Sequence, residues 1–381
     1  MTPLLQRVAT ATSKLMHSTA IPLPAGGHSL RQLLRRHQRQ RLSLLLLVSL
    51  VCAVALLSIA IGPVNIPLTD VLRALAGLAG LPAGEVPPQH EAVILSIRLP
   101  RTLLGLLVGA GLAVAGAAMQ GLFRNPLADP GLIGVSAGAA LAAVSVIVLG
   151  GTGLAVVTDA LGPFSLPIAA FAGGLATTLL VYRLASSDGR TSVTTLLLAG
   201  IAINALCGAG TGLLTYLADD QQLRTLTFWS MGSLGGATWP AVGTAALFIA
   251  VPLLALPLLA RTLNALLLGE AEAGHLGIAV QQMQRIIVTL AALAVGAAVA
   301  VSGIIGFVGL VVPHLLRLAL GPDHGFLLPG SALLGGALLL LADLLARTLV
   351  TPAELPIGIL TALLGGPFFL ALLLRWRRTA L

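Results

Sequence analysis

RLPRTLLGLLVGAGLAVAGAAMQGLFRNPLADPGLIGVSAG, residues 98–138, decides the fold of this chain. About twenty residues rich in Leu, Gly and Ala follow the pair Arg98 and Arg101, which is enough to cross a bilayer as a helix. Polar residues and prolines at 124–131 then interrupt the apolar sequence, which resumes at Leu132. Such a break frees backbone groups that hydrocarbon cannot satisfy, so it is tolerated where they line a cavity or contact other protein. The stretch therefore predicts the wall of a transport path and not a simple anchor.

The composition of the whole chain indicates a helical membrane protein. Of its 381 residues, 57% are hydrophobic and 9% are charged, whereas a soluble domain carries about a quarter of charged residues. Apolar runs of spanning length recur along the sequence, so we expect an all-α, polytopic fold. Cys52 and Cys207 both lie in apolar runs, and we interpret them as small buried hydrophobic residues.

The net charge of +8 does not indicate a nucleic-acid-binding protein. Lys14 is the only lysine, and the arginines gather near the ends of apolar runs. This is the distribution that the positive-inside rule describes for membrane proteins. The sequence offers no soluble face that could carry a patch for polyanions. We therefore expect the lipid bilayer, and no nucleic acid, among the partners.

The apolar runs predict about ten membrane-spanning helices within a permease domain at 42–381. Their expected positions are 42–61, 99–122, 132–149, 164–184, 195–217, 240–259, 286–305, a short helix after Pro313, 328–350 and 357–374. Residues 1–41 are expected to form a cytoplasmic, partly disordered tail. Residues 260–285 are amphipathic and too charged to span, so we expect helices there that lie in the cytoplasm.

The basic residues also set the expected orientation. With both termini in the cytoplasm, 16 of the 21 Lys and Arg residues lie on the cytoplasmic side. The residues left outside are Arg73, Arg98, Arg101, Arg224 and Arg347.

A weak internal repeat relates the two halves of the chain. A shift of 187 residues superimposes these pairs: Arg98 and Arg285, Gly109 and Gly296, Ala110 and Ala297, Gly116 and Gly303, Pro126 and Pro313. The two copies begin an odd number of spans apart, so they would have opposite orientations in the membrane. Inverted repeats with interrupted helices are typical of transporters.

The chain resembles the permease subunits of type II ABC importers, which take up iron-siderophores, heme and vitamin B12. The quoted stretch carries this resemblance together with TTLLLAGIAIN (194–204), FWSMGSLGGATW (228–239), GHLGI (274–278), SGIIGFVGLVVPHLLRLALGPDHGFLLPGSALLGGALLLLADLLART (302–348) and ELPIGILTALLGGPFFLALLL (354–374). The segments follow in order at matching spacing and cover most of the chain from 45 to 375. Their length makes the resemblance far more specific than a short motif.

The resemblance implies a homodimer of ten-helix subunits in the bacterial inner membrane, with the transport path at the dimer interface. Two cytoplasmic ATP-binding subunits would drive transport, and a periplasmic heme- or siderophore-binding protein would deliver the substrate. The chain would then be no enzyme and would bind no cofactor itself, because ATP and Mg belong to the partner ATPase. In agreement, the sequence contains no Gly-rich phosphate loop ending in Lys and Ser or Thr.

The resemblance assigns docking of the binding protein to Arg98, Arg101 and Arg347. Arginines in such places can register and steer an acidic partner. They can also be interfacial anchors whose charged ends reach the headgroups. For Arg347 a further alternative is an intramolecular pair with Asp343, one helical turn away. An acid inside an apolar run is by default a functional candidate, yet this neighbour favours structural pairing for Asp343.

By the same resemblance, four residues form the cytoplasmic gate: Asn125, Leu127, Val193 and Thr194. Valine at 193 departs from the small polar residue expected there, and Asn125 could also cap the next helical segment. Coupling to the ATPase is assigned to paired short helices, and the residues concerned are Glu270, Glu272, Gly274, His275, Leu276 and Gly277. A solvated charged face is the alternative for that segment. No histidine has the spacing of a metal ligand, so we expect no metal site.

The expected substrate is heme, because residues 219–239 resemble the heme-transporting branch most. Ferric siderophores and vitamin B12 are the alternatives within the family. A secondary transporter driven by an ion gradient would need paired acids near mid-membrane, whereas Asp343 is the one acid deep in an apolar run. A non-transporting membrane scaffold is the remaining class, and the broken, repeated helices argue against it.

Overall fold

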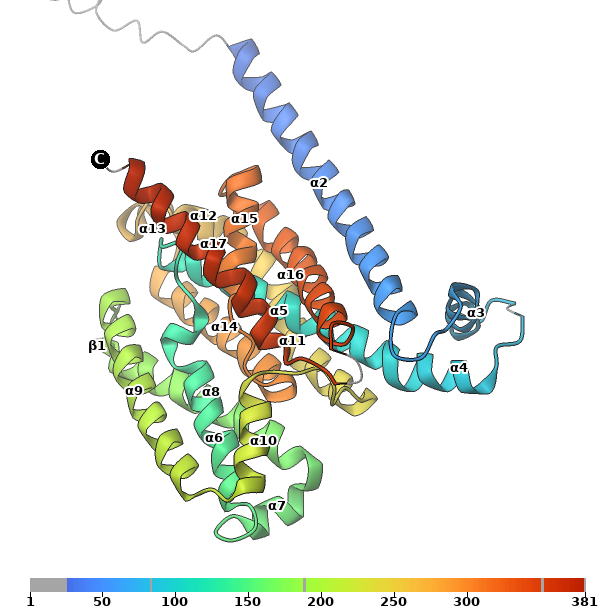
Figure 1. Cartoon of the computed structure of the whole chain (residues 1–381). Coiled ribbons are helices and arrows are strands. Elements are labelled where there is room, and N and C mark those ends of the chain that lie inside the picture. The colour runs from blue at the N-terminus through green and yellow to red at the C-terminus, as the bar shows by residue number, and fades with distance from the viewer. Residues whose placement is uncertain (1–25, 83, 188–189, 351–352, 380–381) are drawn as a thin grey trace, which may run out of the picture. The chain divides into compact units, whose positions relative to one another are not determined.

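The computed structural model describes residues 26–82, 84–187, 190–350 and 353–379 (Figure 1). The chain divides into two compact units, 1–43 and 44–381. The described part of the first unit, 26–43, is helical and belongs to α2 (Gly26–Ala60). Helix therefore already covers 26–41 of the expected tail, while the rest of that tail lies outside the described residues. Every contact discussed below lies within the second unit.

Helices account for nearly all of the second unit. After α2 come α3 (Leu68–Leu78), α4 (Pro88–Val93), the π-helix η1 (Ile94–Arg98), α5 (Leu99–Leu122), the 3₁₀ helix η2 (Pro130–Ile133), α6 (Val135–Leu149), α7 (Ala155–Leu161), η3 (Gly162–Phe164), α8 (Ser165–Leu184), α9 (Val193–Leu217) and α10 (Asp220–Ser230). The second half contains α11 (Trp239–Leu258), α12 (Ala260–Leu266), α13 (Glu270–His275), α14 (Val280–Ser302), α15 (Val308–Leu320), α16 (His324–Ala346) and α17 (Ile357–Thr379). Two short strands, β1 (Ser186–Ser187) and β2 (Arg190–Thr191), pair antiparallel between α8 and α9.

The expected all-α membrane fold is confirmed. Within the described ranges, seven helices are long and apolar enough to span a bilayer, and three shorter apolar helices are α6, α15 and the apolar part of α17. Together they match the ten expected spans in order. Three starts were placed too late: α15 begins at Val308 and contains Pro313, α14 begins at Val280 and not at 286, and α16 begins at His324 and not at 328. A proline within a membrane helix is tolerated where neighbouring groups satisfy the freed carbonyl.

Helix α5 is the centre of the second unit, as the quoted stretch predicts. It packs against α16, α14, α11 and α15 (Figure 1). In the most apolar stretch of the span that contains α5, 83% of the residues are buried, whereas 17% are buried in the corresponding stretch of α9. Small residues permit the close packing: a Cβ on Gly109 would overlap the carbonyl of Gly335, and one on Gly116 would overlap that of Gly309.

The internal repeat is visible in the order of the helices but not residue by residue. In each half a long, buried helix (α5 or α14) is followed by a shorter one (α6 or α15) and later by two longer ones (α8 and α9, or α16 and α17), with the short α7 and η3 inserted in the first half. The superimposed residues differ in conformation, because Pro126 lies in a loop whereas Pro313 lies inside α15. Likewise Gly116 is in mid-helix, whereas Gly303 ends α14 with φ of 68°. The shift of 187 residues therefore aligns elements only.

Candidate functional site

A cluster of charged side chains joins the end of α5 that is expected to face outward to the end of α16. Arg101 donates from Nε and Nη2 to Asp343 Oδ1, at 3.0 and 2.8 Å. Its Nη1 and Nη2 also donate to the two carboxylate oxygens of Glu354, each at 2.9 Å. Asp343 is fully buried, whereas the side chain of Glu354 is 40% exposed. Arg101 thereby connects α5, α16 and the segment before α17.

Arg98 and Arg347 bind the end of α2. Arg98 Nη1 donates to the carbonyls of Ile59 and Ala60, both at 2.7 Å. Helix-terminal carbonyls lack intrahelical donors, so a guanidinium there satisfies them. Arg347 Nη2 donates to the carbonyl of Ser58 at 2.6 Å, and its Nε lies 3.6 Å from Asp343 Oδ2. The intramolecular pair of Arg347 and Asp343 is thus confirmed.

These contacts change how the predicted docking residues are understood. Arg98, Arg101 and Arg347 are all buried, with exposed fractions of 3%, 8% and 4%. Their guanidinium groups are used within the subunit, and the group of the cluster that reaches the surface is Glu354. With three arginines and two carboxylates, the cluster keeps one excess positive charge. A role of these arginines in docking stays a prediction. In it, their bonds fix the ends of α2, α5 and α16 at the outer surface, and the excess positive charge attracts an acidic partner.

The pairing of Glu354 predicts a dependence of stability on pH. The hydrogen bonds from Arg101 hold the pKa of Glu354 below its ordinary value. Ionised Glu354 therefore stabilises the fold above about pH 4.3, the ordinary pKa of a glutamate, and this contribution is lost as pH falls through the lower folded value. On acidification, the midpoint of thermal unfolding in detergent should fall more steeply for the native chain than for Glu354→Gln.

The exposed Glu85 provides a matched control, because Glu85→Gln should keep the native pH slope. Equal slopes for the native chain and Glu354→Gln would contradict the pairing.

The predicted inner gate begins where α5 ends. Arg124 adopts a positive φ of 53°, and the side chain of Asn125 accepts a hydrogen bond from the backbone N–H of Leu127 at 2.9 Å. The cap of the next helical segment is not Asn125 but Asp129, which accepts from Gly131 N at 2.7 Å. Burial raises the pKa of Asp129. Asn125 itself is exposed and closes the turn.

Helix α9, which begins with the second gate segment, packs further along its length against η2, which follows the first gate segment. Asn204 Nδ2 donates to the carbonyl of Gly131 at 3.1 Å, and a Cβ on Gly200 would overlap the carbonyl of Leu132. Val193 is partly buried and Thr194 is exposed. Gly200 and Asn204, in the middle of α9, make these contacts, and neither was among the predicted gate residues. A lone amide within an apolar span was the available signal for Asn204.

The predicted coupling segment consists of two short helices, α12 and α13. The residues assigned to coupling are exposed except Glu270, which accepts from Gln284 Nε2 at 3.0 Å. Leu268 and Leu276 add large exposed apolar side chains to this surface, with exposed fractions of 68% and 66%. An apolar patch within polar surroundings is typical of an interaction site.

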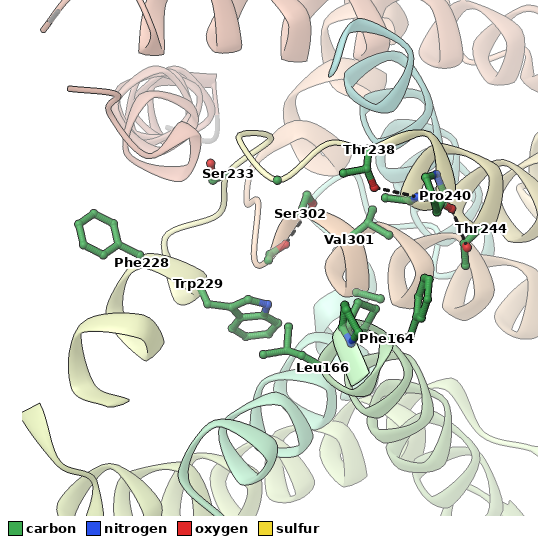
Figure 2. Close-up of a pocket in the computed structure, with 16 residues that line it drawn as sticks. Phe164, Leu166, Phe228, Trp229, Ser233, Thr238, Pro240, Thr244, Val301 and Ser302 are labelled. Atoms are coloured by element: carbon green, nitrogen blue, oxygen red, sulfur yellow. Dashed lines mark hydrogen bonds between the residues drawn. The ribbon is translucent and has the colours of Figure 1, made fainter. Parts of the chain in front are cut away.

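A cavity of about 770 Å³ lies at the opposite end, between the starts of α8 and α11, the end of α14 and helix α10. Figure 2 shows Trp229 directed toward Leu166, with Phe164 nearby and Phe228 set apart. Ligand pockets commonly enclose about 300–1,000 Å³ and have apolar and aromatic walls with few polar groups. Five of its lining residues come from the segment 228–239: Phe228, Trp229, Ser233, Gly236 and Thr238.

A sequence profile of the FecCD transport family matches residues 37–375. This chain belongs to the FecCD transport family. It is 55% identical over 293 residues to the hemin transport system permease protein HmuU of Yersinia pestis, covering 74% of this chain and 83% of that protein. It is 46% identical to the cobalamin import system permease protein BtuC of Halobacterium salinarum, covering 76% and 75% of the two chains.

The fold of this FecCD permease also matches a solved structure. That structure is an inward-facing conformation of a metal-chelate type ABC transporter, with a TM-score of 0.75 and 34% sequence identity. The match covers 87% of this chain and 98% of the other. The chain is therefore a multi-pass membrane permease, which is the transport subunit of an ABC importer.

Proposed function

We propose that this FecCD permease carries heme from a periplasmic binding protein into the cytoplasm. The observation that carries the proposal is the 55% identity to a hemin permease, against 46% to a cobalamin permease. Ferric siderophores and vitamin B12 are the alternative substrates, because permeases for related compounds belong to the same family. Two copies of the chain would enclose the path, and two ATP-binding subunits would supply the energy.

The cavity beside Trp229 supports a large and mainly apolar substrate. Its wall combines Phe164, Leu166 and Trp229 with four hydroxyl groups, those of Ser233, Thr238, Thr244 and Ser302. Aromatic faces pack well against a flat macrocycle. Hydroxyl groups without a fixed charge suit a ligand that must be released again.

The three groups of residues keep their expected roles as parts of this proposal. The Arg98, Arg101 and Arg347 cluster would support docking of the binding protein at the outer surface. Asn125, Leu127, Val193 and Thr194 would form the inner gate. The exposed surface of α13 and the turn after it, Glu270–Gly277, would contact the ATPase.

The pairing of Asp343 weakens the alternative of an ion-driven secondary transporter. A coupling carboxylate must take up and release a cation or proton during transport. Asp343 is fully buried and already bound by Arg101 and Arg347. This arrangement supports a fixed ion pair and not an exchangeable site.

Uptake into proteoliposomes tests the proposal. The permease, assembled with its ATPase, should accumulate heme from a heme-loaded binding protein only when ATP is present. We expect Trp229→Leu to lower heme uptake several-fold, since mutations in ligand pockets commonly have effects of this size. The matched control is Trp239→Leu at the same end, because Trp239 bonds Leu95 O and does not line the cavity.

Three outcomes would contradict parts of the proposal. Uptake of a ferric siderophore or of vitamin B12 without heme would overturn the substrate. Uptake independent of ATP would overturn the ABC mechanism. Equal uptake by Trp229→Leu and Trp239→Leu would separate the cavity from the substrate path. Charge reversal of Arg101 is unsuited to test docking, because it would leave Asp343 buried without its partner.

A further inference from the structure

A hydrogen-bonded bridge links the start of α14 to the end of α8 and to β2, the strand just before α9, and Thr191 is its centre. The backbone N–H of Thr191 donates to Gln281 Oε1 at 2.6 Å. The Thr191 hydroxyl lies 2.7 Å from the hydroxyl of Tyr182 and 2.9 Å from that of Ser186. Arg285 Nε donates to the same Tyr182 hydroxyl at 3.1 Å. Residues from α8, the β-hairpin and α14 therefore meet at one point.

The position of the bridge connects two segments whose roles were assigned separately. Gln281 and Arg285 lie in the first two turns of α14, a few residues after the coupling residue Gly277. Thr191 lies two residues before the gate residue Val193, and Thr191 is only 6% exposed. The first turn of α14 and the side chain of Gln281 thus connect α13 to the residues just before the gate, so a displacement of α13 can be passed on over a short distance.

The packing around the bridge leaves room for movement. A cavity of about 220 Å³ lies between α8 and α14, and its wall includes Tyr182, Arg285, Thr178 and Thr289. Close-packed interfaces transmit strain but have few alternative arrangements. Beside this cavity Arg285 of α14 donates a hydrogen bond to Tyr182 of α8, and such a bond can break and form again as the helices slide.

We propose that Gln281, Tyr182 and Arg285 are positioning residues that transmit the movement of the coupling helices to α9 and so to the cytoplasmic gate. This inference rests on the proposed function, because it takes both the coupling surface and the gate from there. A bridge with a purely structural role would hold the loop in place in every state. A transmitting bridge makes the opening of the gate depend on the nucleotide state of the ATPase.

The test measures heme transport and ATP hydrolysis together in proteoliposomes of the assembled transporter. Gln281→Ala and Tyr182→Phe should keep ATP hydrolysis but lower transport per ATP about fivefold to tenfold, within the usual range of coupling between sites. Gln281→Glu keeps an acceptor for Thr191 N and should restore the native ratio. The matched controls are Gln282→Ala and Tyr216→Phe, which alter the exposed neighbouring glutamine and the exposed tyrosine at the far end of α9.

Combination of the two variants sharpens the test. If both residues act through one bridge, Gln281→Ala with Tyr182→Phe should lower the ratio no further than the stronger single variant. An unchanged ratio in both single variants, or a parallel loss of hydrolysis and transport, would overturn the inference.

Leu276→Asp distinguishes a failure of the proposed bridge from a failure of the coupling assignment on which the bridge rests. This change places a charge on the exposed apolar surface of the coupling segment, so it should impair ATPase assembly or stimulation. If Leu276→Asp behaves as the native chain, the coupling assignment fails. If Leu276→Asp is impaired while Gln281→Ala and Tyr182→Phe behave as the native chain, only the bridge is wrong.

Discussion

Replacement of Asp343 by asparagine should lower the free energy of unfolding by about 3–5 kcal/mol, the usual cost of removing one partner of a buried ion pair. Asp343 accepts two hydrogen bonds from Arg101 Nε and Nη2 and lies 3.6 Å from Arg347 Nε. Both arginines are buried, so the variant leaves them short of negative charge away from water. Unfolding in mixed micelles of increasing SDS content measures the loss.

A matched variant separates this effect from a general loss of charge. Asp159 is exposed, and Asp159→Asn should change the free energy of unfolding by less than about 0.5 kcal/mol. Arg347→Gln combined with Asp343→Asn should cost less than the sum of the two single changes, because the pair is removed together. A loss below about 1 kcal/mol for Asp343→Asn would contradict the ion pair as the structure has it.

Local patterns were sufficient to predict the helical spans and one ion pair. The apolar run after Arg98 predicts a buried central helix because length and composition are local properties. Arg347 and Asp343 lie four residues apart on one helix, so their contact follows from helix geometry. The start of α15 was placed wrongly because a proline near mid-helix has the same local signature as a helix boundary.

Contacts between distant segments could not be predicted from one sequence. Arg101 meets Asp343 and Glu354 across more than two hundred residues, and nothing local distinguishes a paired arginine from a free one at the end of a span. For this reason the sequence did not reveal that the three predicted docking arginines are buried. Thr191 and Gln281 are likewise 90 residues apart, and neither residue type marks a functional bridge.

Replacement of Gly116 by alanine should be among the most damaging single-methyl changes in the chain. A Cβ at this position would overlap the backbone carbonyl of Gly309 in α15. A flexible side chain could turn aside, but a helix backbone must move as a whole. Overpacking of this kind commonly costs about 1–3 kcal/mol, and more where the backbone cannot yield. The same titration with SDS, together with the yield of monodisperse protein, measures the effect.

The neighbouring contacts explain why the α5–α15 crossing should not relax easily. One turn beyond Gly116, the side chain of Gln120 donates to the carbonyl of Leu310 at 3.1 Å, so separation of the helices would also strain this buried hydrogen bond. Gly208 in α9 offers the control, because an added Cβ there would meet no atom within 4 Å. Gly208→Ala should be neutral or stabilising by up to about 1 kcal/mol through helix propensity. Equal stability of Gly116→Ala and Gly208→Ala would show that α5 and α15 are not packed backbone against backbone.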